Sequence, residues 1–110
     1  MLFRSSKSAS SENTYAEDLR DAERIAEELR RMAAELAEWL ERKALEARTV
    51  TVKVRYDDFS TVTRSHSLSQ PTQDAARIGA WAIELLKRTE AGDRPVRLLG
   101  VRVHGFQERR

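Results

Sequence analysis

Apolar and polar residues alternate through the middle of the chain, in the stretch Arg48–Leu68 (RTVTVKVRYDDFSTVTRSHSL). One side of its first half is apolar, with Val50, Val52, Val54 and Tyr56, and the other is polar, with Thr49, Thr51, Lys53 and Arg55. A period of two is typical of a strand with one face on a core and one in water. Asp57-Asp58 supplies turn residues and Ser60–Leu68 resumes the β-rich pattern, so the stretch predicts a hairpin.

Two stretches show the spacing of three and four residues that is typical of amphipathic helices. The first runs from about Glu17 to about Lys43, and its apolar stripe is Ile25, Leu29, Met32, Leu36 and Leu40. Its acidic start, at Glu17, Asp18 and Asp21, suits the positive end of a helix. The second runs to about Thr89 after Pro71-Thr72, with Thr72 predicted as the N-cap and Asp74 in the first turn. Ala91-Gly92-Asp93 closes it, because glycine tolerates a left-handed turn.

Extended segments are predicted at both ends of the chain. Arg4–Ser11 is a short polar strand with Ala9 inward, and Val96–Phe106 alternates, with Leu99, Val101 and Val103 inward and Leu98, Gly100, Arg102 and His104 outward. The order is therefore β-α-β-β-α-β, an α+β fold of the ferredoxin-like type. We expect a four-stranded antiparallel sheet with two helices on one face and an open basic face. Residues 1–110 form a single domain whose core spans about residues 4–106.

The net charge of +2 conceals a strong segregation of charge along the chain. Segments 1–11, 48–56, 59–73 and 94–107 contain no acidic residue and nine basic ones, namely Arg4, Lys7, Arg48, Lys53, Arg55, Arg64, Arg94, Arg97 and Arg102. The preference of Glu for helices explains part of this pattern. The rest of this charge segregation predicts a basic sheet packed on acidic helices. Such a sheet would attract nucleic acid to one face of the domain. The chain has no cysteine, so it can form no disulfide and its redox compartment stays open. No apolar run is long enough to span a membrane, so we expect no membrane contact, and a cytoplasmic location is the default expectation.

Three segments resemble one known family: KSASSENTYAEDL, RTVTVKVRYDDFSTVTRSHSL and PVRLLGVRVHGF. They are similar to the little-finger (polymerase-associated) domain of Y-family translesion DNA polymerases, in particular the bacterial DNA polymerase IV branch. The resemblance spans about residues 4–106. It implies the same β-α-β-β-α-β fold, with the open face of the sheet lying against duplex DNA and gripping the template and primer backbones.

The resemblance also implies residues that contact DNA. Lys7-Ser8 matches the family's first strand, the segment Thr63, Arg64, Ser65 and His66 matches the one that holds phosphates, and Arg97 and Arg102 flank the last strand's L-G-V. Lys53 and Arg55 join them from the outward face of the hairpin. Simple alternation from an inward Val62 would bury Arg64 and His66, and a buried unpaired arginine is costly. A bulge near Thr63–Ser65, or a place for Arg64 at the sheet edge, would resolve this conflict.

Catalytic patterns are incomplete in this sequence. Tyr56-Asp57-Asp58 spells the motif of some polymerase palm hairpins, but two-metal chemistry needs a further acid on a neighbouring strand, and none is predicted there. His66 and His104 lack a carboxylate partner, and the hydroxyls of Ser5, Ser6, Ser8, Ser65 and Ser67 lack an activating base. We therefore expect no enzymatic activity, no metal site and no cofactor. Any Mg²⁺ would belong to the palm of a parent polymerase.

The expected partner is duplex primer-template DNA, bound by a monomer. In a full-length parent, the polymerase core domains and the sliding clamp are further expected partners. Two alternatives use the same fold differently: an RNA-binding module that stacks bases on sheet aromatics, and a regulatory module that dimerises through its sheet or helices.

Overall fold

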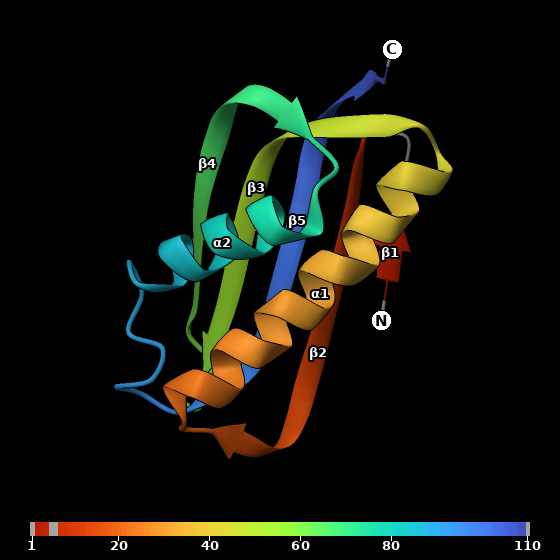
Figure 1. The fold of residues 1–110 in the computed structure, drawn as a ribbon. Helices are drawn as coiled ribbons and strands as arrows, with labels where there is room; N and C mark the ends of the chain where they lie inside the picture. Colours follow the sequence, from red (N-terminus) through yellow and green to blue (C-terminus); the bar gives the residue numbers. More distant parts are fainter. Residues whose placement is uncertain (1, 5–6, 110) are drawn as a thin grey trace.

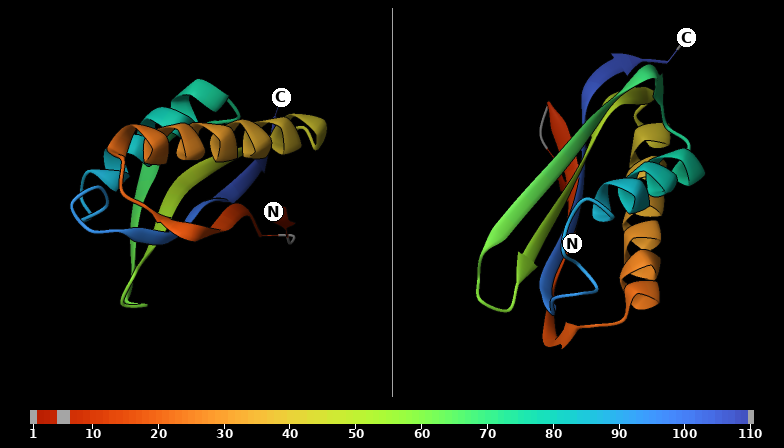
Figure 2. Two further views of the ribbon diagram at one scale, coloured as in Figure 1. Left: turned by 90° about the horizontal axis from the view of Figure 1, so that it is seen from below. Right: turned by 90° about the vertical axis from the view of Figure 1, so that its left-hand side faces the viewer.

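The computed structural model describes residues 2–4 and 7–109, with side chains described from Lys7 onward. Its elements are β1 (Leu2–Arg4), β2 (Ser8–Leu19), α1 (Ala22–Arg42), β3 (Leu45–Tyr56), β4 (Thr61–Thr72), α2 (Ala75–Leu86) and β5 (Val96–Glu108). The strands pair antiparallel in one sheet, in the order β1-β2-β5-β3-β4. Both helices lie on one face of this sheet (Figures 1 and 2). The predicted ferredoxin-like fold is confirmed, with the short β1 added at the edge beside β2.

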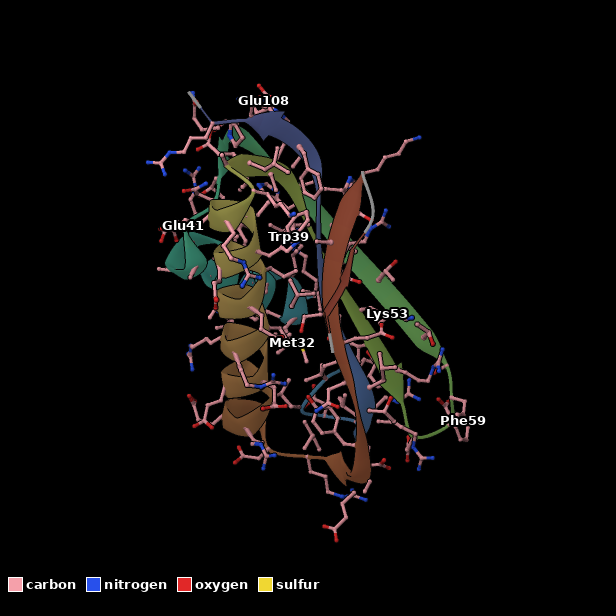
Figure 3. The ribbon with its side chains drawn as sticks, turned by 90° about the vertical axis from the view of Figure 1, so that its right-hand side faces the viewer. Met32, Trp39, Glu41, Lys53, Phe59 and Glu108 are labelled. Atoms are coloured by element: carbon pink, nitrogen blue, oxygen red, sulfur yellow. The ribbon has the colours of Figure 1, made fainter. Side chains whose placement is uncertain are left out.

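The apolar stripes read from the sequence meet in one core between the helices and the sheet. Val52 and Val54 of β3 and Leu99 of β5 have no exposed surface, and Tyr56 is 1% exposed. From α1, Ile25, Leu29, Met32 and Leu36 complete the core with no exposed surface either. Figure 3 shows Met32 and Trp39 between α1 and the sheet, and Lys53 on the opposite side of the sheet. Burial of these side chains fixes which face of each strand points inward.

The N-terminal boundaries differ from the prediction. The strand predicted at Arg4–Ser11 is interrupted after β1, and β2 continues to Leu19, which pairs with Val96 of β5. Ser5 and Ser6, within the predicted strand, lie outside the described residues. Glu17 and Asp18 are therefore strand residues rather than the start of the helix. The N-cap is Asp21, whose side chain accepts the backbone N–H of Glu23 at 3.0 Å.

The second helix is also capped differently from the prediction. Thr72 is the last residue of β4, and Asp74 is the N-cap, accepting the backbone N–H of Ala76. The Thr72 hydroxyl instead accepts the N–H of Asp74 at 3.0 Å and leads the chain into the cap. The helix ends at Leu86, one turn before the predicted Thr89. Gly92 adopts a φ of 96°, which is the left-handed turn expected at Ala91-Gly92-Asp93.

Candidate nucleic-acid interface

The face of the sheet opposite the helices, which we call the outer face, is a regular lattice of mostly polar side chains. The register aligns rows that cross β2, β5, β3 and β4 in that order. These rows are Ser8–His104–Thr49–Ser67, Ser10–Arg102–Thr51–Ser65, Glu12–Gly100–Lys53–Thr63 and Thr14–Leu98–Arg55–Thr61. No helix covers this lattice in either view of Figure 2. The structure therefore brings six of the ten predicted contact residues onto one surface: Ser8, Lys53, Arg55, Thr63, Ser65 and Arg102.

Hydroxyl groups form ordered pairs along the β3–β4 side of the outer face. Thr49 Oγ1 lies 3.1 Å from Ser67 Oγ, and Thr51 Oγ1 lies 2.7 Å from Ser65 Oγ. In the last row, Arg55 Nε donates to Thr61 Oγ1 at 3.0 Å. Cross-strand hydroxyl pairs stabilise the hairpin and hold these side chains upright. Short hydroxyl side chains therefore lie close to the backbone of the sheet, and the longer side chains of lysine and arginine extend further from it beside them.

The cations of the outer face come from neighbouring strands. Lys53 and Arg55 are on β3 and Arg102 is on β5, and Arg102 is exposed. Within residues 7–109, no carboxylate lies in ion-pair contact with Arg102. Lys53 Nζ, in contrast, lies 3.8 Å from Glu12 Oε2. The expectation of acid-free strands is therefore wrong. Because β2 runs to Leu19, β3 begins at Leu45 and β5 ends at Glu108, the strands carry Glu12, Glu17, Asp18, Glu46 and Glu108.

A hollow lies in the middle of the outer face, above Gly100 of β5. It has a volume of about 240 Å³. Its lining residues are Ser10, Glu12, Thr51, Lys53, Thr63, Gly100, Val101 and Arg102. Glycine at position 100 leaves the neighbouring strands' side chains free to lean across β5. Beside it, Leu98 points outward as predicted and yet is only 6% exposed.

His104, in the first row, is held in its neutral form by its surroundings. Partial burial lowers the pKa of His104, and the positive charge of Arg102 lowers it further. The imidazole is therefore neutral at physiological pH and adds no cation to the face. It stays available as a hydrogen-bonding group beside Ser8 and Thr49.

Arg64 and His66 do not lie on the outer face. Val62, Arg64 and His66 pair with Val54, Val52 and Val50, which are core residues, so all three point to the helix side of the sheet. No bulge intervenes in this part of β4, and the irregularity lies further on, between Ser67 and Thr72. The predicted conflict is resolved by the edge position of β4. Arg64 is exposed there, and its Nη1 donates to the carbonyl of Thr63 at 2.8 Å.

His66 instead packs against the second helix. Its ring stacks on Trp81 of α2, with the ring centroids 3.5 Å apart and the planes 11° from parallel. This contact packs the edge strand β4 against α2. Packing alone is therefore enough to explain a histidine at position 66. His66 therefore lies on the helix side of the sheet, as simple alternation indicated, because its partner in the register is the buried Val50.

The other two predicted contacts flank the outer face. Lys7 is exposed at the bend that precedes β2. Arg97 lies at an irregularity in β5, where Tyr56 pairs with Val96 and Arg55 with Leu98. Its Nε donates to Asp18 Oδ1 at 3.2 Å, and its guanidinium lies 4.8 Å from the centre of the Phe59 ring. Arg97 is thus held by neighbours at one end of the sheet.

The Tyr56-Asp57-Asp58 motif forms the turn of the β3–β4 hairpin. The Tyr56 hydroxyl accepts the backbone N–H of Glu90 at 2.8 Å, and Arg94 lies 4.1 Å above its ring. Hydrogen bonds from Ser60, chiefly from its hydroxyl, and the nearby Arg94 lower the pKa of Asp58. Among the residues that the structure describes, no group of three or more His, Asp or Glu side chains gathers as a metal site. The described helices are also too short or too polar to cross a membrane.

The helix side of the molecule has a different electrostatic character. Tyr15 donates to Glu28 Oε1 at 2.7 Å, and Arg31 bonds the same carboxylate at 3.3 Å. Burial, with the Glu28 hydrogen bond, raises the pKa of Tyr15 well above its usual value. Ser11 of β2 donates to Glu35 of α1 nearby. Glu28 and Glu35 are therefore engaged in packing α1 against β2.

Sequence reasoning did not place Glu12 on the outer face, and it placed Gly100 outward without giving it a role in the site. Extending the alternation of Ser8 and Ser10 by one step would have placed Glu12 outward. The significance of Gly100 had no local signal, because it depends on which strands lie on either side of β5.

Comparisons with known proteins agree on one family. A family model described as the impB/mucB/samB family C-terminal domain matches residues 6–110. The DNA polymerase IV of Alkalilimnicola ehrlichii is 48% identical over 103 residues, covering 94% of this chain and 29% of that protein. That of Halorhodospira halophila is 47% identical over 104 residues, with the same coverage. The chain thus spans less than a third of the length of these curated relatives.

Solved structures share the fold. A complex of a β-clamp processivity factor and the little finger domain of PolIV matches with a TM-score of 0.71 at 28% identity, covering 88% of this chain and 86% of that one. An insertion ternary complex of Dbh DNA polymerase matches with a TM-score of 0.73 at 18% identity, over 88% of this chain and 28% of that one. The second likeness is one of fold alone.

Proposed function

Because this chain belongs to the impB/mucB/samB family C-terminal domain, the little finger of DNA polymerase IV-like Y-family polymerases, we propose that its outer face grips the phosphate backbone of duplex DNA. The observation that carries this proposal is the uncovered lattice in which Lys53, Arg55 and Arg102 rise among paired hydroxyls. Lysine, arginine and hydroxyl groups are the usual protein partners of phosphate oxygens. Lys53 and Arg55 are two residues apart on one strand, so their Cα atoms are about 7 Å apart.

The proposed binding is sequence-tolerant. The four rows of the outer face contain no Asn or Gln, the side chains that read adenine in the major groove. Direct reading of bases is also usually done by a helix or ribbon inserted in a groove, whereas this surface is broad. The domain therefore adds affinity for DNA without choosing its sequence.

The observed lattice disfavours the RNA-binding alternative. That mode needs aromatic side chains on the central strands of the sheet. The central outer positions here are held by Gly100, Arg102, Thr51 and Lys53, and Tyr56 is buried in the core. Nothing observed favours the dimerising alternative, so we propose that the domain acts as a single copy.

Within a longer polymerase, we propose a supporting rather than catalytic role. Nucleotide transfer and its Mg²⁺ would reside in domains outside this chain, which spans 29% of its relative in Alkalilimnicola ehrlichii. Contact with those domains and with a sliding clamp would complete the set of partners. The clamp is proposed because the structural match at 28% identity is a little finger domain in complex with a β-clamp.

A titration of a fluorescein-labelled duplex, followed by anisotropy at several salt concentrations, tests the proposal. We expect a Kd of about 10⁻⁴–10⁻⁶ M at physiological salt. The outer face offers three cations to phosphates, Lys53, Arg55 and Arg102, so log K should fall against log salt with a slope of about −3. Two duplexes of unrelated sequence should bind equally. A slope near zero, or a strong preference for one duplex, would refute the phosphate-gripping role.

A further inference from the structure

The third row of the outer face contains an ion pair that spans an intervening strand. Glu12 of β2 and Lys53 of β3 both pair in register with Gly100 of β5, which lies between them. Their side chains reach across that strand until Lys53 Nζ lies 3.8 Å from Glu12 Oε2. The Lys53 side chain is 38% exposed and the Glu12 side chain is 32% exposed, so the contact is open to solvent.

Glycine at position 100 makes this crossing possible. A Cβ added there would lie 3.1 Å from Glu12 Cβ and 3.5 Å from Glu12 Oε2. The first distance is shorter than an ordinary van der Waals contact, so a side chain at position 100 would crowd Glu12 and require it to shift by a few tenths of an ångström. The missing side chain also leaves the hollow of about 240 Å³ in the sheet.

The chemistry of the hollow suits a single phosphate group. Two cations, Lys53 and Arg102, and the hydroxyls of Ser10, Thr51 and Thr63 line it. Cations and hydroxyls are the groups that bind phosphate oxygens. The Glu12 carboxylate is the one negatively charged group in this lining, and it would repel a phosphate. Its anionic oxygens lie against Lys53, where phosphate oxygens would bind.

We propose that the hollow above Gly100 is a subsite for one DNA phosphate, and that Glu12 is a built-in competitor which a phosphate must displace from Lys53. This inference rests on the proposed function, and it adds a residue that limits the affinity of the outer face for DNA. An exposed ion pair is weak, so a phosphate can replace the carboxylate. The glutamate nevertheless lowers the affinity of the face, and this keeps the grip of the domain on DNA loose.

The experiment compares duplex binding by four variants of this chain, using the labelled duplex at 0.1 M salt. Glu12→Gln keeps the shape of the side chain and removes its charge. The matched control is Glu84→Gln on α2, where Glu84 forms a similar exposed pair, 3.5 Å from Lys87. Lys53→Gln and the double variant Glu12→Gln/Lys53→Gln complete the cycle. Thermal unfolding of each variant establishes that it is folded.

We expect Glu12→Gln to bind about fivefold more tightly than the wild type, the effect of one charge at contact distance in water. Glu84→Gln should change affinity by less than about twofold, because screening acts over about 10 Å at this salt concentration. Lys53→Gln should bind more weakly and flatten the salt slope by about 1. In the Lys53→Gln background, removing Glu12 should gain about twofold or less.

Each contrary result has a distinct meaning. If the wild type shows no salt-dependent binding, the proposed function fails and the subsite fails with it. If the wild type binds and Glu12→Gln gains no more than Glu84→Gln, the competitor is refuted while the proposed function stands. If Glu12→Gln gains equally with and without Lys53, the carboxylate acts by simple repulsion, and displacement from Lys53 is wrong.

Discussion

Reversing the charge of Arg102 tests where on the molecule DNA binds. Arg102 is exposed on the outer face, beside the Gly100 hollow, so Arg102→Glu removes a cation and adds an anion without touching the core. The matched control is Arg77→Glu, which makes the same change at an exposed position on α2, in the helical layer. Arg31 is a poorer control, since it bonds Glu28 at 3.3 Å, within the contacts that pack α1 on β2.

The expected magnitude follows from Coulomb's law. Two unit charges 4 Å apart interact by about 1 kcal/mol in water. Reversal turns that attraction into repulsion, a change of about 2 kcal/mol, or about 30-fold in Kd. Arg77 is separated from DNA on the outer face by both layers, and helices and sheets pack about 10 Å apart. Because the Debye length at 0.1 M salt is also about 10 Å, its reversal should change Kd by less than about twofold.

Anisotropy titrations at 0.1 M salt, with a thermal melt of each variant, measure both effects. Both Tm values should stay close to that of the wild type, because exposed substitutions rarely change stability by more than about 0.5 kcal/mol. Equal losses of affinity in the two variants would show that binding follows net charge alone. A loss confined to Arg77→Glu would place the DNA on the helices. Either result would refute the outer-face interface.

Three further outcomes are expected. Tyr56→Phe deletes the acceptor of the Glu90 N–H, 2.8 Å away, and should lower the free energy of unfolding in urea by about 1–2 kcal/mol; an unchanged midpoint would contradict this. Leu29→Ala, at a position with no exposed surface, should cost about 2–5 kcal/mol in the same assay, and a cost below 1 kcal/mol would argue against the packed core. His104 has a lowered pKa when folded, so the unfolded chain takes up the proton first, and stability should fall as pH drops below about 6.5. His104→Gln should flatten that fall, and an identical pH profile would refute the assignment.

The alternation of residues 48–56 was sufficient to predict β3 and its two faces. Burying Val50, Val52, Val54 and Tyr56 requires Lys53 and Arg55 to point outward, whatever the strand pairs with. The same reasoning predicted the outward place of Arg102 on β5. For β4 the same alternation put Arg64 and His66 on the face of Val62, as the structure has them, and of the two resolutions offered the edge position is the one observed. An edge strand lets such residues reach solvent or a partly buried ring such as that of Trp81, and edge position is a property of the sheet.

Helix boundaries depended on contacts that local patterns do not reveal. Several acids precede α1, and each is an acceptable start in electrostatic terms. Pairing of Leu19 with Val96 extends β2 past Glu17 and Asp18 and leaves Asp21 as the cap. Likewise, Thr72 stays in β4 because it pairs with Ala47 of β3, and Asp74 becomes the N-cap of α2.

The sequence by itself determined β3 and β5, the apolar stripes of both helices and the outward cations Lys53, Arg55 and Arg102, because period and burial act along a single segment. The tertiary structure alone decided which side chains meet. Glu12, Gly100 and Lys53 are far apart in the chain, and they share a row only because β5 lies between β2 and β3 in a particular register. A shift of one residue in either pairing would turn the opposite face outward and abolish the hollow. The register is fixed by the whole core packing at once, so the candidate site emerges only in the folded sheet.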